Sequence, residues 1–183
     1  MLFDAPLIPG LGTCEEFVTE EEEQALIAAI DQVDLAPFRF QGFTGKRLTH
    51  SFGWRYDFEN GRFAETDPIP DWLLPYRDRA AAFAGIAADA FGHALLIRYD
   101  PGAGIGWHRD RPVFDQVVGI SLGAAAVLNF RQRTGSGFRR AKLPLPRRCA
   151  YHLSGEVRRE WEHRIASHDA LRYSVTFRSL AAS

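Results

Sequence analysis

The sequence predicts an α+β protein whose core is an antiparallel β structure. Two helical segments are expected in the first half, whereas the second half carries short β-branched or aromatic runs separated by glycine or proline. The chain has 183 residues, 46% of them hydrophobic and 25% charged, which fits one globular domain. We therefore expect residues 1–93 to hold the N-terminal helices and residues 94–183 to form the β core of one integrated domain.

The first helix is predicted to begin at Thr19. The segment from Thr19 to Glu22 matches a capping box, and its acidic residues suit the positive end of the helix dipole. Leu26, Ile30 and Val33 follow at positions i, i+4 and i+7, which places them in one stripe. This helix should therefore bury one face and expose its acidic first turn.

The rest of the chain divides into further segments. Residues 1–18 are expected to be an extended lead-in, and residues 38–63 to form strands and loops. A second helix is predicted from about Asp71 to about Phe91, with Pro75 in its first turns. Five strands are predicted in the second half, at ALLIRY, VVGISL, AVLNF, RCAYHL and RYSVTF.

Composition limits the cellular setting and the partners. The net charge of -1 gives no general attraction for nucleic acid, although a local basic patch can still bind one. Cys14 and Cys149 are too few for a disulfide framework and favour a reducing environment. No apolar run reaches the ~20 residues that a membrane span needs, and the N-terminus lacks the pattern of a signal peptide. We expect a cytoplasmic monomer without membrane contact.

A possible metal site begins with an H-x-D pair, His108 and Asp110. On an extended chain these two side chains point to the same face, like two arms of a chelate. Two histidines and one carboxylate on one side of a metal are the usual ligands of non-haem iron(II). The pair alone is a weak pattern, and periodicity cannot choose the third ligand among His152, His163 and His168.

A second candidate site lies in the run Arg172 to Arg178. Alternation along a strand places Arg172, Ser174, Thr176 and Arg178 on one face and apolar residues on the other. Arginine binds carboxylates through a planar two-donor fork, so two arginines on one face suit a short dicarboxylic acid. An edge strand with two exposed arginines is the alternative.

In their order along the chain, these motifs resemble the AlkB family of iron(II)- and 2-oxoglutarate-dependent dioxygenases. The interval from Asp110 to His163 is also similar to the family's. The resemblance is firm over residues 94–180 and loose before them. The matching segments are L-L-I-R-Y-D-P-G-A-G-I-G-W-H-R-D, V-V-G-I-S-L-G, V-L-N-F, L-P-R-R-C-A-Y-H-L-S-G-E-V-R-R-E-W-E-H-R-I and L-R-Y-S-V-T-F-R.

The resemblance implies a fold, a reaction and a set of residues. The fold is a double-stranded β-helix, or jelly roll, with helices packed on its outside. The reaction uses iron(II), 2-oxoglutarate and O2 to demethylate or hydroxylate a substrate oxidatively. The implied metal ligands are His108, Asp110 and His163. The implied 2-oxoglutarate residues are Tyr99, Arg172 and Arg178.

The substrate is expected to be a nucleic acid, either alkylated DNA or modified RNA. The family has a substrate-recognition lid before the β core, and residues 38–63 occupy that place here. For residues 38–63 the alternative is an ordinary half-buried strand, and for the basic stretch 131–148 it is a solvated loop. Base stacking is expected from Phe52, Trp54 and Tyr56, and phosphate contacts from Arg139, Arg140 and Arg147 in the basic stretch 131–148.

Two departures from the family pattern bear on the substrate. The acidic residues that DNA-repair members usually carry after the H-x-D are replaced here by Arg111, Pro112 and Val113. Ile97 and Ser174 stand where many repair members have asparagine. The alternatives are therefore the same chemistry on a protein side chain, or a non-catalytic binding module with this fold.

Overall fold

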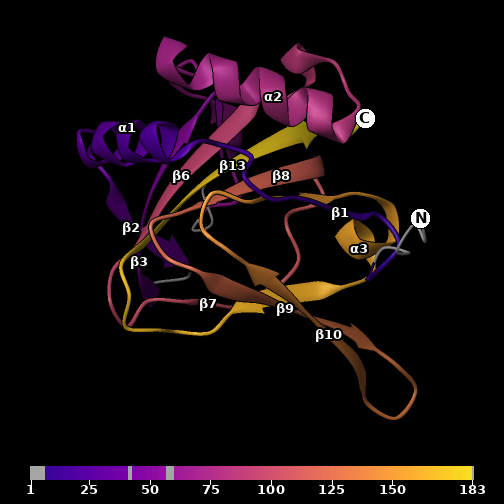
Figure 1. Cartoon of the computed structure of the whole chain (residues 1–183). Coiled ribbons are helices and arrows are strands. Elements are labelled where there is room, and N and C mark those ends of the chain that lie inside the picture. The colour runs from indigo at the N-terminus through magenta and orange to yellow at the C-terminus, as the bar shows by residue number, and fades with distance from the viewer. Residues whose placement is uncertain (1–6, 41–42, 57–59, 183) are drawn as a thin grey trace, which may run out of the picture.

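The protein is built from two antiparallel β-sheets stacked on each other, with helices on the outside of the larger sheet (Figure 1). The computed structural model describes residues 7–40, 43–56 and 60–182, and the side chains of these residues except 38–40, 43–45 and 56. This architecture is the predicted α+β jelly roll. None of the described helices is long and apolar enough to cross a membrane.

The larger sheet contains seven strands. Two of its strand pairs, β1 with β11 and β3 with β6, join the N-terminal part of the chain to the β core. In spatial order the strands are β1 (Leu11–Cys14), β11 (Ala150–Leu153), β8 (Phe114–Leu122), β13 (Arg172–Leu180), β6 (His93–Tyr99), β3 (Phe43–Phe52) and β2 (Ala36–Phe40).

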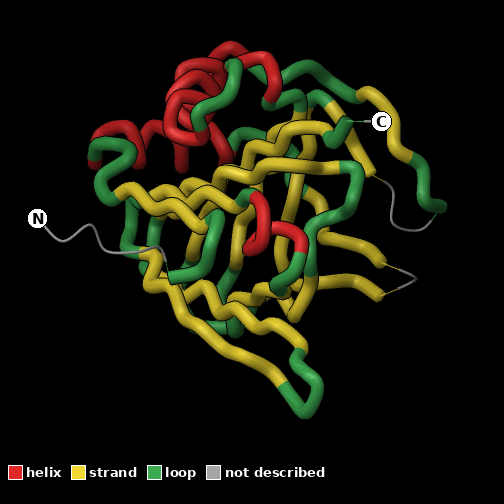
Figure 2. The backbone as a smooth tube through the Cα atoms, turned by 90° about the vertical axis from the view of Figure 1, so that its right-hand side faces the viewer, coloured by secondary structure: helices red, strands yellow, loops and turns green. Residues whose placement is uncertain are grey.

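The smaller sheet contains four strands, and a separate two-stranded ribbon lies beside the larger sheet. The ribbon pairs β4 (Trp54–Tyr56) with β5 (Phe63–Glu65). Figure 2 shows the long β9–β10 hairpin projecting at the end of the molecule opposite the main helices. In spatial order the four strands are β10 (Phe138–Leu145), β9 (Ala126–Arg133), β12 (Glu162–Ile165) and β7 (Ile105–His108).

The first predicted helix is confirmed as α1 (Glu20–Asp31). Thr19 is its N-cap, and the side chains of Thr19 and Glu22 close both bonds of a capping box. A short helix, α3 (Gly155–Arg159), lies between β11 and β12.

The second predicted helix is shorter than expected. A 3-10 turn at Asp71–Leu73 leads into α2 (Leu74–Ala84), with Pro75 in its first turn. The helix ends at Ala84 because Gly85 takes a left-handed conformation with φ 73°. A separate 3-10 turn at Ala88–Ala90 then precedes β6.

The larger sheet buries both of its faces. Its outer face carries apolar side chains, among them Ile120, Val175 and Phe177, which pack against α1 and α2 in the main core. Its inner face meets the smaller sheet around a second apolar cluster that includes Phe130 and Trp161. The candidate functional residues lie beside this second cluster, between the two sheets.

Candidate metal and co-substrate site

Three potential metal ligands meet between the sheets. His108 ends β7, Asp110 follows two residues later, and His163 lies on β12 directly opposite His108 in the strand register. Nε2 of His108 lies 3.5 Å from Oδ1 of Asp110, and Nε2 of His163 lies 3.7 Å from the same oxygen. All three ligand atoms lie within 4.8 Å of one another. Strand pairing therefore brings a distant histidine to the H-x-D pair.

Neighbouring groups orient the ring of His108 and keep the imidazole of His163 neutral. Nδ1 of His108 lies 2.8 Å from the carbonyl oxygen of Gly106, a contact that directs Nε2 toward the cluster. Burial, with His108 beside it, lowers the pKa of His163 to about 3, so this imidazole is neutral at neutral pH. A neutral imidazole is the form that binds a metal, and two imidazoles with one carboxylate suit iron(II).

The carboxylate of Asp110 stays ionised although its side chain is buried. Burial on its own raises the pKa of Asp110, but Arg178 and the two histidines hold the pKa well below its usual value. Nε of Arg178 donates to Oδ2 of Asp110 at 2.7 Å. Arg178 therefore compensates the buried charge and leaves Oδ1 facing the two histidines.

Arg172 is a buried cation that offers a place for an anion. Its side chain is among the largest that the structure buries completely, at 1% exposure. Nε and Nη2 donate to Oγ of Ser121 at 3.2 and 3.0 Å, and the guanidinium lies 5.0 Å from the ring centre of Tyr99. Among the described residues, Nη1 finds no hydrogen-bond partner. A carboxylate would satisfy this donor and balance the charge, which suits a 2-oxo acid.

The alternation predicted for this segment is confirmed in β13. The strand places Arg172, Ser174, Thr176 and Arg178 toward the smaller sheet, whereas Val175 and Phe177 pack in the main core. Ser174 pairs in register with Ile97 of β6, and Arg172 pairs with Tyr99. The two family departures, Ile97 and Ser174, are therefore buried neighbours on the face that carries the arginines.

Sequence reasoning missed two residues beside the arginines, Ser121 and Tyr151. Tyr151 lies opposite Gly119 in register, and a Cβ added at Gly119 would overlap its ring. Burial raises the pKa of the Tyr151 phenol, and Tyr99 and Arg172 are among the groups that act on it. Alternation along the predicted strand could have indicated Ser121, because Ser121 and Gly119 are the small residues on the inward face of β8. The sequence held no comparable signal for Tyr151.

The aromatic residues predicted to stack on a base are separated by the fold. Phe52 packs in the main core under the helices, so its side chain cannot meet a substrate. Trp54 stacks on Phe63 within the ribbon, with ring centres 4.8 Å apart, and Phe63 contacts Phe114 at 5.8 Å. The side chain of Tyr56 lies outside the described residues.

The basic stretch 131–148 is not one loop. Its first residues end β9, and residues 138–145 form β10, a strand that the sequence did not predict and that pairs with β9 along its whole length. Arg147 is bound instead to the buried carboxylate of Glu23, with Nη2 2.6 Å from Oε1. Arg139 and Arg140 are neighbours on a strand and so point to opposite faces of the smaller sheet. The structure therefore does not bring Arg139, Arg140 and Arg147 together in one cluster, and their contacts with phosphate stay a prediction.

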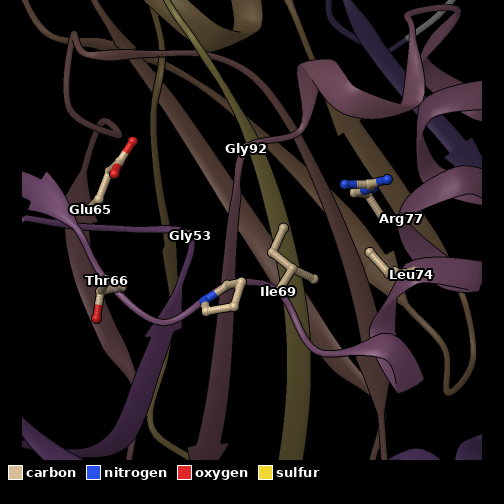
Figure 3. A pocket seen from close by; sticks show the side chains of 8 residues that line it. Gly53, Glu65, Thr66, Ile69, Leu74, Arg77 and Gly92 are labelled. Carbon is tan, nitrogen blue, oxygen red and sulfur yellow. The ribbon is translucent and has the colours of Figure 1, made fainter.

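Two hollows on the surface lie apart from these residues. One, of about 380 Å³, lies between the β4–β5 ribbon and α2, with Gly53, Glu65 and Arg77 on its rim (Figure 3). The other lies beside the first turn of α1. Neither is lined by a candidate metal or co-substrate residue, so the chemistry of the side chains, and not the size of a hollow, identifies the site.

Comparison with known proteins agrees with this chemistry. Residues 10–178 match the family described as the 2OG-Fe(II) oxygenase superfamily. The Salmonella typhimurium alpha-ketoglutarate-dependent dioxygenase AlkB is 29% identical over 208 residues, covering 96% of this chain and 93% of that protein. The Danio rerio protein called probable RNA/DNA demethylase ALKBH6 is 32% identical over 117 residues, covering 63% of this chain and 47% of that protein.

A third relative is much longer than this chain. The Macaca fascicularis tRNA (carboxymethyluridine(34)-5-O)-methyltransferase ALKBH8 is 30% identical over 165 residues, which are 87% of this chain and 24% of that protein. The chain thus spans about a quarter of the length of that relative.

Solved structures share the fold. OsALKBH1 superposes with a TM-score of 0.67 at 16% identity, covering 94% of this chain and 97% of that one. A Pseudomonas putida prolyl-4-hydroxylase gives a TM-score of 0.62 at 16% identity, covering 95% and 94%. The family match over residues 10–178 places the chain in the 2OG-Fe(II) oxygenase superfamily, and its curated relatives make it an AlkB-like member of this family, which uses iron(II), 2-oxoglutarate and O2.

Proposed function

We propose that this dioxygenase demethylates or hydroxylates a nucleic acid oxidatively, with iron(II) held by His108, Asp110 and His163. The observation that carries the metal assignment is the meeting of these three donors beside Arg178, which compensates the buried carboxylate. The relatives named above support the substrate class, since their names refer to tRNA and to RNA or DNA. The specific base, and the choice between demethylation and hydroxylation, belong to the same proposal.

The two arginines take different parts in binding 2-oxoglutarate. Arg178 is already bound to Asp110, so the end of the co-substrate near Arg178 is the end that reaches the metal. Arg172 has an unsatisfied Nη1 and grips the other carboxylate, with Ser121 fixing the guanidinium. Tyr99 lies against Arg172 and orients it through its ring.

The bound metal and co-substrate supply the oxidation of a C–H bond, and the protein supplies placement. His108, Asp110 and His163 would hold a bound iron(II) through two imidazoles and one carboxylate, a ligand set that leaves positions for the co-substrate and O2. The apolar cluster around Phe130 and Trp161 limits water beside the site. Hydroxylation of an N-methyl group would give an N-hydroxymethyl group, and breaking its C–N bond would release formaldehyde and leave an N–H.

Succinate release tests this proposal. Purified protein with iron(II) and 2-oxoglutarate should form succinate, and more of it with a methylated oligonucleotide than with an unmethylated one. His163→Ala should reduce succinate to background because a neutral imidazole ligand is lost. His152→Ala is the matched control, since His152 lies on β11, hydrogen-bonded to Gln116, away from the donor cluster.

Formaldehyde measured beside succinate separates demethylation from hydroxylation. Full turnover in His163→Ala would remove this histidine from the metal site. Stimulation by methylated peptides, with no response to any oligonucleotide, would assign the activity to a protein side chain. Absence of succinate under every condition would identify a non-catalytic binding module.

A further inference from the structure

The smaller sheet has an outer face that the helices leave bare. The helices α1 and α2 cover the outer face of the larger sheet, and α3 packs in the second apolar cluster beside β8, so none of the three covers the outer face of the smaller sheet (Figures 1 and 2). On the smaller sheet, His108, Phe130 and His163 are paired in register and point inward. Their neighbours along the strands therefore point outward.

Five cations share this outward direction. They come from β9, β10 and β12, three strands that are neighbours in the sheet, of which β12 lies apart from the other two in the sequence. We call them the outer basic face: Arg131, Arg133, Arg140, Lys142 and Arg164.

Two aromatic rings order the arginines of the outer basic face. The guanidiniums of Arg131 and Arg164 lie 4.4 and 4.7 Å from the ring centre of Trp107. Arg131 also lies 4.4 Å from the ring centre of Phe138, on which Arg133 and Arg140 lie at 5.1 and 5.7 Å. Stacking holds each planar group in place, so less side-chain entropy is lost when the group binds a ligand.

The charge on this face is largely uncompensated. Among the outward residues of β7, β9, β10 and β12, all within the described chain, Glu162 alone is acidic. It pairs with Arg131, with Nε 3.0 Å from Oε1. Four cations therefore remain for an anionic partner on a chain whose total charge is -1.

The position of Trp107 links this face to the metal site. β7 is one of the two edge strands of the smaller sheet. On it Trp107 points outward, and the next residue, His108, points inward to the candidate metal ligands. A chain that lies on the outer basic face and turns around this edge reaches the site between the sheets.

We propose that the outer basic face binds the phosphate backbone of single-stranded nucleic acid and delivers the target base around the β7 edge. This proposal rests on the proposed function and names the surface that holds its substrate. The regular series of cations suits a polyanion, because each phosphate contact adds to the affinity. A single strand is required because His163 and Asp110 are buried, so the base must enter unpaired.

The test measures binding of fluorescent single-stranded RNA and DNA of about 20 nucleotides at several salt concentrations. The double variant Arg140→Ser/Arg164→Ser should bind roughly tenfold more weakly, and its salt slope should be shallower by about 1.4, at ~0.7 per lost contact. Its KM for a methylated oligonucleotide should rise while kcat is retained. Arg139→Ser is the matched control: it removes an exposed arginine from the same strand, on the opposite face, near Trp161.

The outcomes separate this proposal from the proposed function. Wild-type binding that depends on salt, weakened in the double variant and unchanged in Arg139→Ser, supports the outer basic face. Equal binding by wild type and double variant, with oligonucleotide turnover intact, overturns this face and leaves the proposed function standing. If the wild type binds polyglutamate as tightly as it binds the oligonucleotides, the assignment of this face to nucleic acid is overturned. If the wild type neither binds nor oxidises any oligonucleotide, both proposals fail.

Discussion

The outer faces of the two sheets are built in opposite ways. The larger sheet places apolar side chains outward and covers them with α1 and α2. The smaller sheet places cations outward and leaves them to solvent, ordered by Trp107 and Phe138. Between them lie the candidate metal ligands and arginines, to which both sheets contribute. The comparison teaches that an outer face covered by helices buries apolar side chains, whereas an outer face left to solvent can carry a series of charges.

Truncating a side chain on the covered face should have the largest effect on stability. Phe177 is fully buried against the helices, and Phe177→Ala should lower the free energy of unfolding by about 3–5 kcal/mol. Val127, on the outer face of the smaller sheet, is 42% exposed, and Val127→Ala should change it by less than about 0.5 kcal/mol. Urea unfolding of both variants measures this. Similar losses would mean that both faces support the fold equally.

Truncating an arginine between the two sheets should lower the affinity for 2-oxoglutarate more than it lowers the stability of the fold. Arg172 offers a buried guanidinium to a carboxylate. Its loss should weaken the binding free energy of 2-oxoglutarate by about 2 kcal/mol, which raises Kd roughly 30-fold. Calorimetry with manganese in place of iron would measure the Arg172→Ala variant. Arg98→Lys is the control, because Arg98 pairs with Asp100 and Asp31 and not with the interior groups. Unchanged affinity in Arg172→Ala would remove this arginine from the co-substrate site.

A pH dependence of stability is expected from one buried histidine. His93 lies on β6 at 3% exposure, stacked on Phe114, and burial, with Arg178 nearby, lowers its pKa to about 3. Between pH 6.5 and about 3 the unfolded chain therefore binds a proton that the folded protein does not, so stability falls as the pH falls. His93→Phe should flatten this dependence by at most one proton, or about 1.4 kcal/mol per pH unit.

Urea unfolding of the metal-free protein at pH 4.5, 5.5 and 6.5 would measure the slope. Above pH 7 His93 is neutral in both states, so wild type and His93→Phe should there share one pH dependence. An identical slope below pH 6.5 would show that His93 titrates alike in the folded and unfolded chain.

Local patterns made much of this molecule predictable. The capping box at Thr19 and the alternation from Arg172 to Arg178 depend only on neighbouring residues, and both are confirmed. The H-x-D pair came from local spacing too, but choosing His163 required the resemblance, because the pairing of β12 with β7 joins segments far apart in the chain.

What the sequence did not reveal depends on long-range packing. In β10 the alternation of Ala141, Leu143 and Leu145 with basic residues or proline is confined to its second half, and the density of basic residues around it indicated a loop. Only its pairing with β9 shows that it is a strand. Phe52 lies on an aromatic strand, but only the position of the helices decides that its side chain faces the core. Arg147 belongs to a basic stretch, and its partner Glu23 is 124 residues away.

The ring of Tyr151 fills the space that a side chain at Gly119 would occupy. Because the two positions face each other on adjacent strands, the space that one side chain fills is lost to the other. A shorter residue at 151 would free room for a side chain at 119, whereas an enlarged 119 would displace the phenol from its place near Arg172 and Tyr99. During divergence the two positions are thus expected to vary together, so that the shape of the space beside Arg172 and Tyr99 is inherited as a property of the pair.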